Sequence, residues 1–361
     1  MRGKQPSMTP PIEIPVSKVP QSRLSQIDFN NLEFGKYTAD HMLVVEYDKG
    51  EWGSPKIVPF GDISLSPISL VLHYAQTVFE GMKAFKMADG NVSIFRMEKH
   101  YQRFLKSLER MCMPAIPEDI FKEGIKQVVK TDAAWIPSSE GGALYLRPFM
   151  IATEQRLGVK ISDKYLFMVV TSPVGPYYAK PLNMKIETEY VRAAEGGTGY
   201  AKCGGNYGAS FLPTQLARQQ GFDQVLWTDA KEHKYLDEAG TMNVMFVIDG
   251  KLATPPLSTS ILDGVTRDSI LTLAPQLGIE TEQRRITVEE LETALSAGRV
   301  TEAFGAGTAA VVAPIQSISI RGKEYQLPAW NDDSFMMRVK KQLSDIRLGN
   351  VADSKGWNTV V

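Results

Sequence analysis

The sequence is poor in the residues that build disulfide frameworks and metal clusters. Its 361 residues include only 2 cysteines, Cys112 and Cys203, and 4 histidines. Two cysteines so far apart in sequence form neither a disulfide framework nor a metal-binding pair, and the histidines stand at no metal-ligand spacing. So low a cysteine content suits a reducing compartment, so we expect a cytoplasmic protein that holds no metal.

Long hydrophobic runs and an excess of charge of one sign are also missing. No apolar run approaches the length of a membrane-spanning helix, and no apolar core follows the basic N-terminus as it would in a secretory signal. With 40 basic and 41 acidic residues the net charge is −1, so no polybasic surface points to nucleic acid or to an anionic membrane. We therefore expect neither as a partner.

The length and the apolar content predict two domains. Hydrophobic residues make up 43% of the chain and charged residues 22%, which is typical of a globular protein with a sizeable core. Residues 1–172 are the predicted N-terminal domain, which includes a loosely held, proline-broken arm over 1–19. The proline-rich segment 173–183 is the predicted interdomain loop, and residues 184–361 form the second domain. Hairpins and helices mix without a βαβ rhythm, so the predicted fold class is α+β.

Apolar periodicity and turn residues locate the individual elements. The predicted helices cover 70–79, 97–111, 118–131, 211–220, 267–277 and 288–296, and a last helix begins near Ser334. The predicted strands cover 42–47, 56–60, 84–87, 92–95, 143–150, 165–170, 224–228, 242–248, 251–254 and 302–304.

One glycine-rich segment surrounds a lysine. Between Gly196 and Gly208, six glycines flank Lys202, which stands between Ala201 and Cys203 rather than among polar residues. Glycine lets a backbone approach a ligand closely. A partly desolvated lysine amine is a nucleophile that forms Schiff bases, most commonly with pyridoxal phosphate. From this segment alone, a glycine-rich turn around one buried lysine stem is an equal alternative.

A carboxylate stands just before an apolar run further along the chain. Asp237 and Glu238 precede the run from Met242 to Ile248, which is typical of a buried strand. A carboxylate at the mouth of such a strand needs a cationic partner. A pyridinium nitrogen would be one, whereas a helix cap or a surface position is the alternative.

Together with seven further segments, these two stretches resemble the branched-chain-amino-acid aminotransferases, which are pyridoxal-phosphate enzymes of fold type IV. The further segments are 32–36, 40–43, 72–74, 79–85, 144–148, 264–267 and 304–308, so the resemblance covers nearly the whole chain. It implies a two-domain fold type IV architecture, with a smaller N-terminal α/β domain and a larger C-terminal domain around a β-barrel-like core. It also implies pyridoxal 5′-phosphate as the cofactor.

The resemblance assigns catalytic and phosphate-binding roles residue by residue. Lys202 matches the lysine that carries the cofactor and moves the substrate Cα proton, Glu238 the partner of the pyridinium nitrogen, and Tyr207 the partner of the ring 3′ oxygen. The residues matched to the phosphate are Arg96, Val265, Thr266 and Thr308. Val265 and Thr266 open a predicted helix, whose first N–H groups suit an anion. For Arg96, a surface position at a helix start is the alternative.

The substrate side is assigned in the same way. Aromatic residues matched to the substrate side chain are Phe34, Tyr74, Phe79 and Tyr145. Thr241 and the N–H of Ala309 match contacts to the α-carboxylate, and Arg147 matches the residue that meets the distal carboxylate of glutamate. Val174 matches an interdomain-loop residue that closes the site of a neighbouring subunit, which implies a homodimer.

The implied reaction is transamination of L-leucine, L-isoleucine and L-valine with 2-oxoglutarate, which gives branched-chain 2-oxo acids and L-glutamate. Within the same fold, a D-amino-acid aminotransferase or a 4-amino-4-deoxychorismate lyase is the alternative. Neither would be expected to carry the set Tyr74, Phe79, Tyr145 and Arg147. A phosphate-binding regulatory protein without catalysis is the alternative from another class.

The cysteines mark one departure from the family. Some animal members carry a Cys-x-x-Cys pair after the phosphate loop, where this chain has Ala310 and Ala313. If the segment around Lys202 is extended, Cys203 faces away from the cofactor, because alternate side chains face opposite ways. We expect Cys112, at the end of a helix, to be packed rather than reactive.

Overall fold

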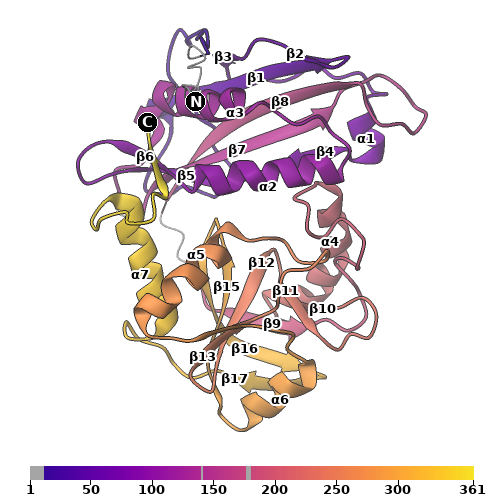
Figure 1. Ribbon diagram of the computed structural model, residues 1–361, viewed down its shortest axis with the longest axis vertical. Coiled ribbons are helices and arrows are strands. Elements are labelled where there is room, and N and C mark those ends of the chain that lie inside the picture. Colours follow the sequence, from indigo (N-terminus) through magenta and orange to yellow (C-terminus); the bar gives the residue numbers. More distant parts are fainter. Residues whose placement is uncertain (1–11, 140, 176–179) are drawn as a thin grey trace, which may run out of the picture.

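The computed structural model describes residues 12–139, 141–175 and 180–361, which form two nine-stranded sheets with helices packed against them (Figure 1). The first sheet comes from the N-terminal half and from the last strand, in the order β18-β6-β5-β7-β8-β1-β2, with β3 beside β1 and β4 beside β7. Its strands are β1 (His41–Asp48), β2 (Glu51–Trp52), β3 (Lys56–Pro59), β4 (Thr77–Phe79), β5 (Met82–Lys86), β6 (Val92–Phe95), β7 (Ala143–Ala152), β8 (Lys164–Val174) and β18 (Asn358–Val360).

Amphipathic helices cover the first sheet. They are α1 (Leu70–Tyr74), α2 (Met97–Arg110) and α3 (Glu118–Thr131), with short 3₁₀ turns at Leu24–Gln26 and Ala133–Trp135. In α2 the buried apolar residues Met97, Tyr101, Phe104 and Leu108 recur at helical spacing. They join residues of α3 and of the sheet in one hydrophobic core.

The second sheet closes on itself. Strands β11-β10-β9-β16-β15-β12 form a path, and β12 also pairs with β11, so these six strands make a closed barrel. β13 and β14 extend the sheet from β12, and β17 extends it from β16. The strands are β9 (Leu182–Ile186), β10 (Gln224–Thr228), β11 (Leu236–Ala239), β12 (Met242–Ile248), β13 (Lys251–Thr254), β14 (Thr281–Gln283), β15 (Val300–Gly307), β16 (Val311–Ile320) and β17 (Lys323–Gln326).

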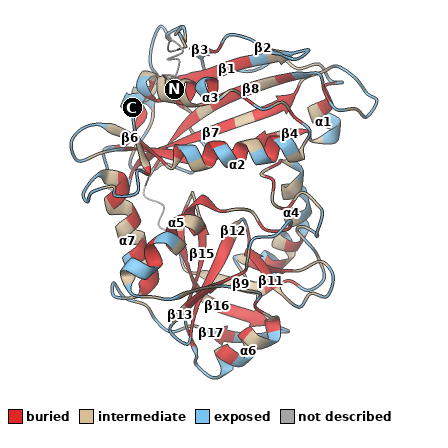
Figure 2. Ribbon diagram, viewed as in Figure 1, coloured by how far each residue is buried: buried red, intermediate tan, exposed pale blue. Residues whose placement is uncertain are grey.

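Four helices belong to this second half. They are α4 (Gly205–Gln219), α5 (Val265–Leu273), α6 (Val288–Ser296) and α7 (Phe335–Leu348), and a 3₁₀ turn at Ala274–Leu277 follows α5. Figure 1 shows α2 lying along the junction between the two halves and α7 descending beside it. After α7 the chain returns to the first half, where β18 pairs with β6. The buried residues gather on the strands of both sheets and on the inner sides of the helices (Figure 2).

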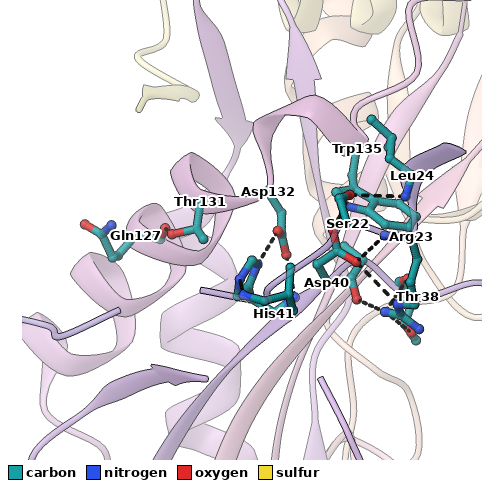
Figure 3. A network of polar contacts seen from close by, with 12 residues as sticks. Ser22, Arg23, Leu24, Thr38, Asp40, His41, Gln127, Thr131, Asp132 and Trp135 are labelled. Carbon is teal, nitrogen blue, oxygen red and sulfur yellow. Dashed lines mark hydrogen bonds and ion pairs between the residues drawn. The ribbon is translucent and has the colours of Figure 1, made fainter. Parts of the chain in front are cut away.

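Residues 12–19 were expected to be loosely held, and the structure corrects this. Val16 bridges to Ile57, and the backbone N–H of Val19 donates to Nε2 of His41 at 3.1 Å. Nδ1 of His41 lies 2.7 Å from Asp132, so the ring carries its proton on Nδ1 and donates it to that carboxylate (Figure 3). Residues 1–11 of the predicted arm lie outside the described residues.

A neighbouring network fixes the chain that follows. Asp40 accepts hydrogen bonds from the Ser22 hydroxyl, from Arg23 and from the Trp135 indole (Figure 3). Burial opposes the charge of this carboxyl, but these donors outweigh it and lower the pKa of Asp40. The network therefore anchors the N-terminal segment to β1.

Most predicted elements agree with the structure, but the helix 70–79 and the bounds of the loop 173–183 do not. The helix 118–131 and the strands 242–248 and 251–254 are confirmed with the bounds predicted. The predicted helix 70–79 is only five residues long, because Ala75 takes a left-handed conformation (φ 51°) and the chain then pairs with β7 as β4. The predicted loop 173–183 begins inside β8 and ends inside β9, and its residues 176–179 lie outside the described residues. Among the described helices, none is both long and apolar enough to cross a membrane.

Candidate active site

A cavity of about 770 Å³ lies between the two halves. Its lining residues from the first half are Phe34, Phe79, Gly81, Arg103, Tyr145 and Arg147. The predicted site residues that line it from the second half are Lys202, Tyr207, Glu238, Thr241, Val265, Thr266, Thr308 and Ala309. Tertiary structure therefore brings together twelve of the fifteen predicted site residues.

Lys202 is held at the edge of this cavity by an extended segment that leads into α4. Its carbonyl accepts from the N–H of Phe79 at 3.0 Å, and its own N–H donates to the Ser107 hydroxyl at 2.9 Å. Nζ donates to the Tyr207 hydroxyl at 3.3 Å and lies 4.7 Å from the centre of the Phe79 ring. On the other face of the segment Cys203 is buried in the hydrophobic core, which confirms the predicted alternation. The amine is thus presented to the cavity beside a phenol and an aromatic ring.

Glu238 is a fully buried carboxylate in β11, at the floor of the cavity. Oε1 accepts from Nδ2 of Asn243 at 2.9 Å and from the N–H of Leu262 at 3.0 Å, and Oε2 forms an ion pair with Arg192 at 3.1 Å. Burial is the largest influence and raises the pKa of Glu238, while Arg192 and the Leu262 N–H oppose that rise. Gly264 is needed here, because a Cβ at that position would lie 1.8 Å from Oδ1 of Asn243.

The N-terminus of α5 presents backbone N–H groups at one end of the cavity. Gly264 is the N-cap in extended conformation, and the first hydrogen bond of the helix is the one from Asp268 to Gly264. The N–H groups of Val265 and Thr266 therefore have no partner within the helix. Thr308, in the turn after β15, lines the same end of the cavity. Such N–H groups at a helix start suit a phosphate.

Arg103, not Arg96, is the arginine at this end, which corrects the sequence prediction. Arg96 lies outside the cavity lining, and its guanidinium bonds to Asp268 and Ser269 and stacks over Trp357 at 4.7 Å. Arg103 is buried and lines the cavity, with bonds of 2.7 and 2.8 Å to Glu80 and one of 3.1 Å to the carbonyl of Asp263.

These three bonds use three of the five N–H groups of Arg103, so two remain for a ligand among the described residues. Glu80 is itself held by Nδ1 of His100 at 2.7 Å. Burial opposes the charge of Glu80, but Arg103 and His100 outweigh it and hold its pKa well below the usual range. The pair thus keeps a charged guanidinium in place beside the start of α5.

An aromatic wall with a stacked arginine forms the opposite end. The rings of Phe34 and Tyr145 meet edge-on with centres 5.0 Å apart. The guanidinium of Arg147 lies 4.8 Å from the Phe79 ring and donates to the Tyr145 hydroxyl at 3.1 Å. Its Nε is buried without a partner among the described residues. This wall can contact an apolar side chain. The guanidinium, whose Nε–H has no partner among the described residues, can donate hydrogen bonds to a carboxylate.

Two predicted substrate residues lie outside this cavity. Tyr74 ends α1, is 40% exposed, and donates its hydroxyl to the carbonyl of Leu157. Val174 is the last residue of β8 rather than part of a loop, and it is buried opposite Ala143. Neither side chain therefore lines the cavity of its own chain, and the roles assigned to Tyr74 and Val174 stay predictions.

Three polar residues of the site were not found from the sequence. Arg103 stands three residues after His100 and four before Ser107, so these polar residues share a strip of α2 beside the apolar face. An arginine beside an apolar face often needs a buried partner, so this spacing could have revealed it. Arg192 and Asn243 had no comparable signal, because their partner Glu238 is distant from Arg192 in sequence and the amide lies inside an otherwise apolar strand.

Comparison with known proteins agrees with this geometry. Residues 77–318 match the family model described as amino-transferase class IV. The chain belongs to that family. Over 92% of its length this class IV aminotransferase is 44% identical to branched-chain-amino-acid transaminase 1 of Bacillus subtilis (strain 168), with 95% of that protein covered. It is 42% identical to the branched-chain-amino-acid aminotransferase of Mycobacterium tuberculosis, with 90% of each chain covered.

Solved structures of other class IV aminotransferases have the same fold. The branched-chain amino acid aminotransferase from Escherichia coli is 26% identical with a TM-score of 0.71, over 89% of this chain and 98% of that one. The branched-chain aminotransferase from the archaeon Thermoproteus uzoniensis, solved with norvaline, is 25% identical with a TM-score of 0.72, over 89% and 99% of the two chains. The fold type IV architecture predicted from the sequence is thereby confirmed.

Class IV aminotransferases use pyridoxal 5′-phosphate, and the residues of this cavity fit that group. The amine of Lys202, the carboxylate of Glu238 and the free N–H groups near Val265 are the three kinds of partner that an aldehyde, a pyridine nitrogen and a phosphate need. The two N–H groups left on Arg103 add a charged donor for the phosphate. A cavity of about 770 Å³ can hold the cofactor and a small amino acid together.

Proposed function

We propose that this class IV aminotransferase transfers the amino group of L-leucine, L-isoleucine or L-valine to 2-oxoglutarate, and so forms branched-chain 2-oxo acids and L-glutamate. One observation carries the proposal. A single cavity holds the Lys202 amine, the buried carboxylate of Glu238 and an aromatic wall on which Arg147 is stacked. This combination suits both an apolar amino acid and a dicarboxylic one. The low cysteine content favours the cytoplasm as the compartment.

The residues of the chain divide the chemical work. When bound, pyridoxal 5′-phosphate supplies an aldehyde that takes up the amino group and a ring that stabilises negative charge at the substrate Cα. Lys202 would take the proton from that Cα onto its amine and then give it to the carbon atom that supplied the aldehyde. Glu238, whose charged form the ion pair with Arg192 favours, would favour the protonated ring nitrogen. Tyr207 would donate to the ring oxygen, and Arg103 with the N-terminus of α5 would hold the phosphate.

Substrate choice follows from the opposite end of the cavity. Phe34, Phe79 and Tyr145 offer apolar contacts to a branched side chain, and Arg147 offers its guanidinium to the distal carboxylate of glutamate. Thr241 and the N–H of Ala309 serve the α-carboxylate. Both amino acids can therefore use one site in turn.

Visible absorbance tests the proposed reaction. The purified protein should absorb in the visible through the cofactor, and L-leucine should bleach that band while 4-methyl-2-oxopentanoate forms. Borohydride reduction followed by peptide mapping should label Lys202. Label on any other lysine would refute the assignment of Lys202.

The same assay separates the alternatives. Bleaching by D-alanine but not by L-leucine would favour a D-amino-acid aminotransferase. Release of pyruvate from 4-amino-4-deoxychorismate would favour the lyase. A protein that binds phosphate compounds without any covalent adduct at Lys202 would be regulatory.

We further propose that the enzyme acts as a homodimer. Around Tyr74 the surface is apolar, with Leu157 63%, Val159 79% and Ile161 57% exposed. Figure 2 shows α1 and the connection between β7 and β8 at the same end of the first half. If a second copy covered this patch, the side chain of Tyr74 would contact that copy. The resemblance assigns Tyr74 to substrate binding. Light scattering should give twice the chain mass, and Val159→Asp should give monomers with weakened activity.

A further inference from the structure

A second, much smaller cavity lies behind the anion-binding end of the active site. Its volume is about 10 Å³, which is room for about one water molecule. Its lining residues are Lys83, Phe85, Phe95, His100, Val265, Thr266, Thr308 and Arg347. Val265, Thr266 and Thr308 also line the large cavity, so the phosphate-binding residues form the wall between the two.

Lys83 reaches this wall from the first half of the molecule. It lies in β5, is 8% exposed, and its Nζ donates to the carbonyl of Ala309 at 2.8 Å. That bond joins β5 to the turn that carries Thr308. An ammonium has three N–H groups, and among the described residues no other hydrogen-bond acceptor and no carboxylate contacts this one.

Arg347 approaches the same cavity from the last turn of α7. It is 7% exposed, and its guanidinium lies 4.5 Å from the centre of the Phe95 ring and 5.7 Å from that of Phe85. Within the described residues its guanidinium has neither a hydrogen-bond acceptor nor an ion-pair partner, and its Nε is fully buried. Among the described residues, the faces of these two rings are thus the only favourable electrostatic contacts of the Arg347 guanidinium.

Two buried cations side by side without an anion are costly, because burial removes hydration and like charges repel. Burial, with a contribution from Arg347, lowers the pKa of Lys83 to about 7, and burial lowers the pKa of Arg347 to about 10. His100, the third basic group at this cavity, is already held by Glu80. An anion bound at Val265, Thr266 and Thr308 would lie on the other side of these residues from Lys83 and Arg347. It would offset the two remaining positive charges.

We propose that Lys83 and Arg347 form a second layer of positive charge for the phosphate group bound at Val265, Thr266 and Thr308. This rests on the proposed binding of pyridoxal 5′-phosphate in the large cavity. The two cations are positioning residues, because backbone and Thr308 separate them from the ligand. The free-energy cost of burying these two charges is present in the cofactor-free chain and is relieved when the phosphate binds.

The proposal predicts opposite effects on stability and on binding. Replacing an unpaired buried cation with an apolar side chain of similar length is neutral or stabilising. Arg347→Met should therefore leave the melting temperature of the cofactor-free full-length chain unchanged or higher. The same variant should bind pyridoxal 5′-phosphate roughly tenfold or more weakly, since a buried charge behind the phosphate-binding residues is lost.

Pyridoxal, which lacks the phosphate, is the probe that isolates this effect. Dissociation constants for pyridoxal 5′-phosphate and pyridoxal should be measured for the wild type, Arg347→Met, Lys83→Met and the control Lys341→Met. Lys341 is on the same helix and carries the same charge, but its exposed side chain is paired with Asp345. Affinity for pyridoxal should hardly change in any variant, and the preference for the phosphorylated compound should fall only in Arg347→Met and Lys83→Met.

Two outcomes would overturn the inference. An unchanged ratio of the two dissociation constants in both variants would show that the cations do not act on the phosphate. Equal losses for the two compounds, with a lower melting temperature of the cofactor-free chain, would show a purely structural role. If wild-type protein bound neither compound, the proposed function itself would fail, and that result is distinct from both.

Discussion

At Glu238 two opposing influences act on a single carboxylate. Burial raises its pKa, whereas Arg192 and the N–H of Leu262 favour the charged form. The group must be charged to favour a protonated ring nitrogen, and the ion pair with Arg192 is the largest of the interactions that favour that charge.

Arg192→Met should therefore move the acidic limb of the pH profile of kcat/KM for L-leucine to higher pH. Loss of the Arg192 cation removes the largest influence that lowers the pKa of Glu238. Burial then raises that pKa further, and the carboxylate is protonated at a higher pH. At neutral pH we expect a loss of about tenfold or more. The control is Arg285→Met, because Arg285 is an exposed arginine that stacks on Tyr235. An acidic limb at the wild-type pH would contradict this role of Arg192.

Arg147 should distinguish the two amino acids that share the site. Its guanidinium stacks on Phe79 and keeps a buried Nε without a partner among the described residues, so it is available to a second carboxylate. Arg147→Met should slow the half-reaction with L-glutamate by about two orders of magnitude and that with L-leucine far less. Single-turnover measurements with each amino acid, and Lys180→Met as a control at the cavity, test this. Equal losses would refute the assignment.

The two cysteines differ in exposure, and one expectation about them was wrong. Cys203 is buried in the core as expected, but Cys112 is exposed and follows the end of α2 with φ 53°. Only Cys203 is next to Lys202, and a thiol without contact to water reacts slowly. Mild peroxide should therefore leave activity nearly unchanged, within about twofold, while mass spectrometry finds any oxidation on Cys112. Reversible inactivation that Cys203→Ser abolishes would contradict this.

At the scale of elements, the structure shows where local sequence signals mislead. The glycines after Lys202 have low helix propensity, so the helix was predicted to begin near Phe211, yet α4 begins at Gly205. Its early start brings Tyr207 within reach of Lys202. In the same way Ala75 ends α1 after five residues, so that β4 can present Phe79 to the cavity.

Gly208 offers a test of the helical start of α4. It lies within the helix, and a Cβ there would meet nothing within 4 Å. Gly208→Ala should raise the free energy of unfolding by about 0.5–1 kcal/mol, because alanine loses less backbone entropy on folding. Gly264→Ala is the contrast, since its Cβ would displace Asn243 from Glu238. Denaturant titration measures both, and a Gly208→Ala variant less stable than the wild type would refute the expectation.

At the scale of the whole molecule, the active site depends on contacts between distant parts of the chain. β18 returns to pair with β6, and Trp357 packs edge-on against Phe95 and under the guanidinium of Arg96. Arg96 also donates its backbone N–H to the carbonyl of Trp357 at 2.6 Å. The role of Arg96 is thus to hold the C-terminal segment against the first sheet.

Trp357→Ala should therefore weaken the whole fold. Removal of a buried tryptophan typically costs about 3–5 kcal/mol through lost contacts and the cavity left behind. Val360→Ala, an exposed position in β18, should change stability by less than about 0.5 kcal/mol. Thermal unfolding of the two variants gives the comparison. Equal midpoints would show that the C-terminal strand contributes little to the first half.

The sequence by itself determined the fold class and selected most of the predicted residues that line the cavity. Local signals were enough for α3, β12 and β13, because their apolar periodicity is strong and their ends carry turn residues. The glycine-rich segment and the resemblance were enough to select Lys202, Glu238 and ten further residues that line the cavity. These features depend on neighbours in the chain or on motifs of fixed spacing, which a sequence displays directly.

Only the tertiary structure decided which charges face one another. Arg103 rather than Arg96 lies at the start of α5, because α2 presents Arg103 toward the junction and its pairing with Glu80 holds it there. Arg192 meets Glu238, and Lys83 and Arg347 come together behind the residues at the start of α5, although they lie far apart in sequence. Such contacts arise when sheets and helices pack, and the energy of a buried charge depends on the partners that packing brings near it.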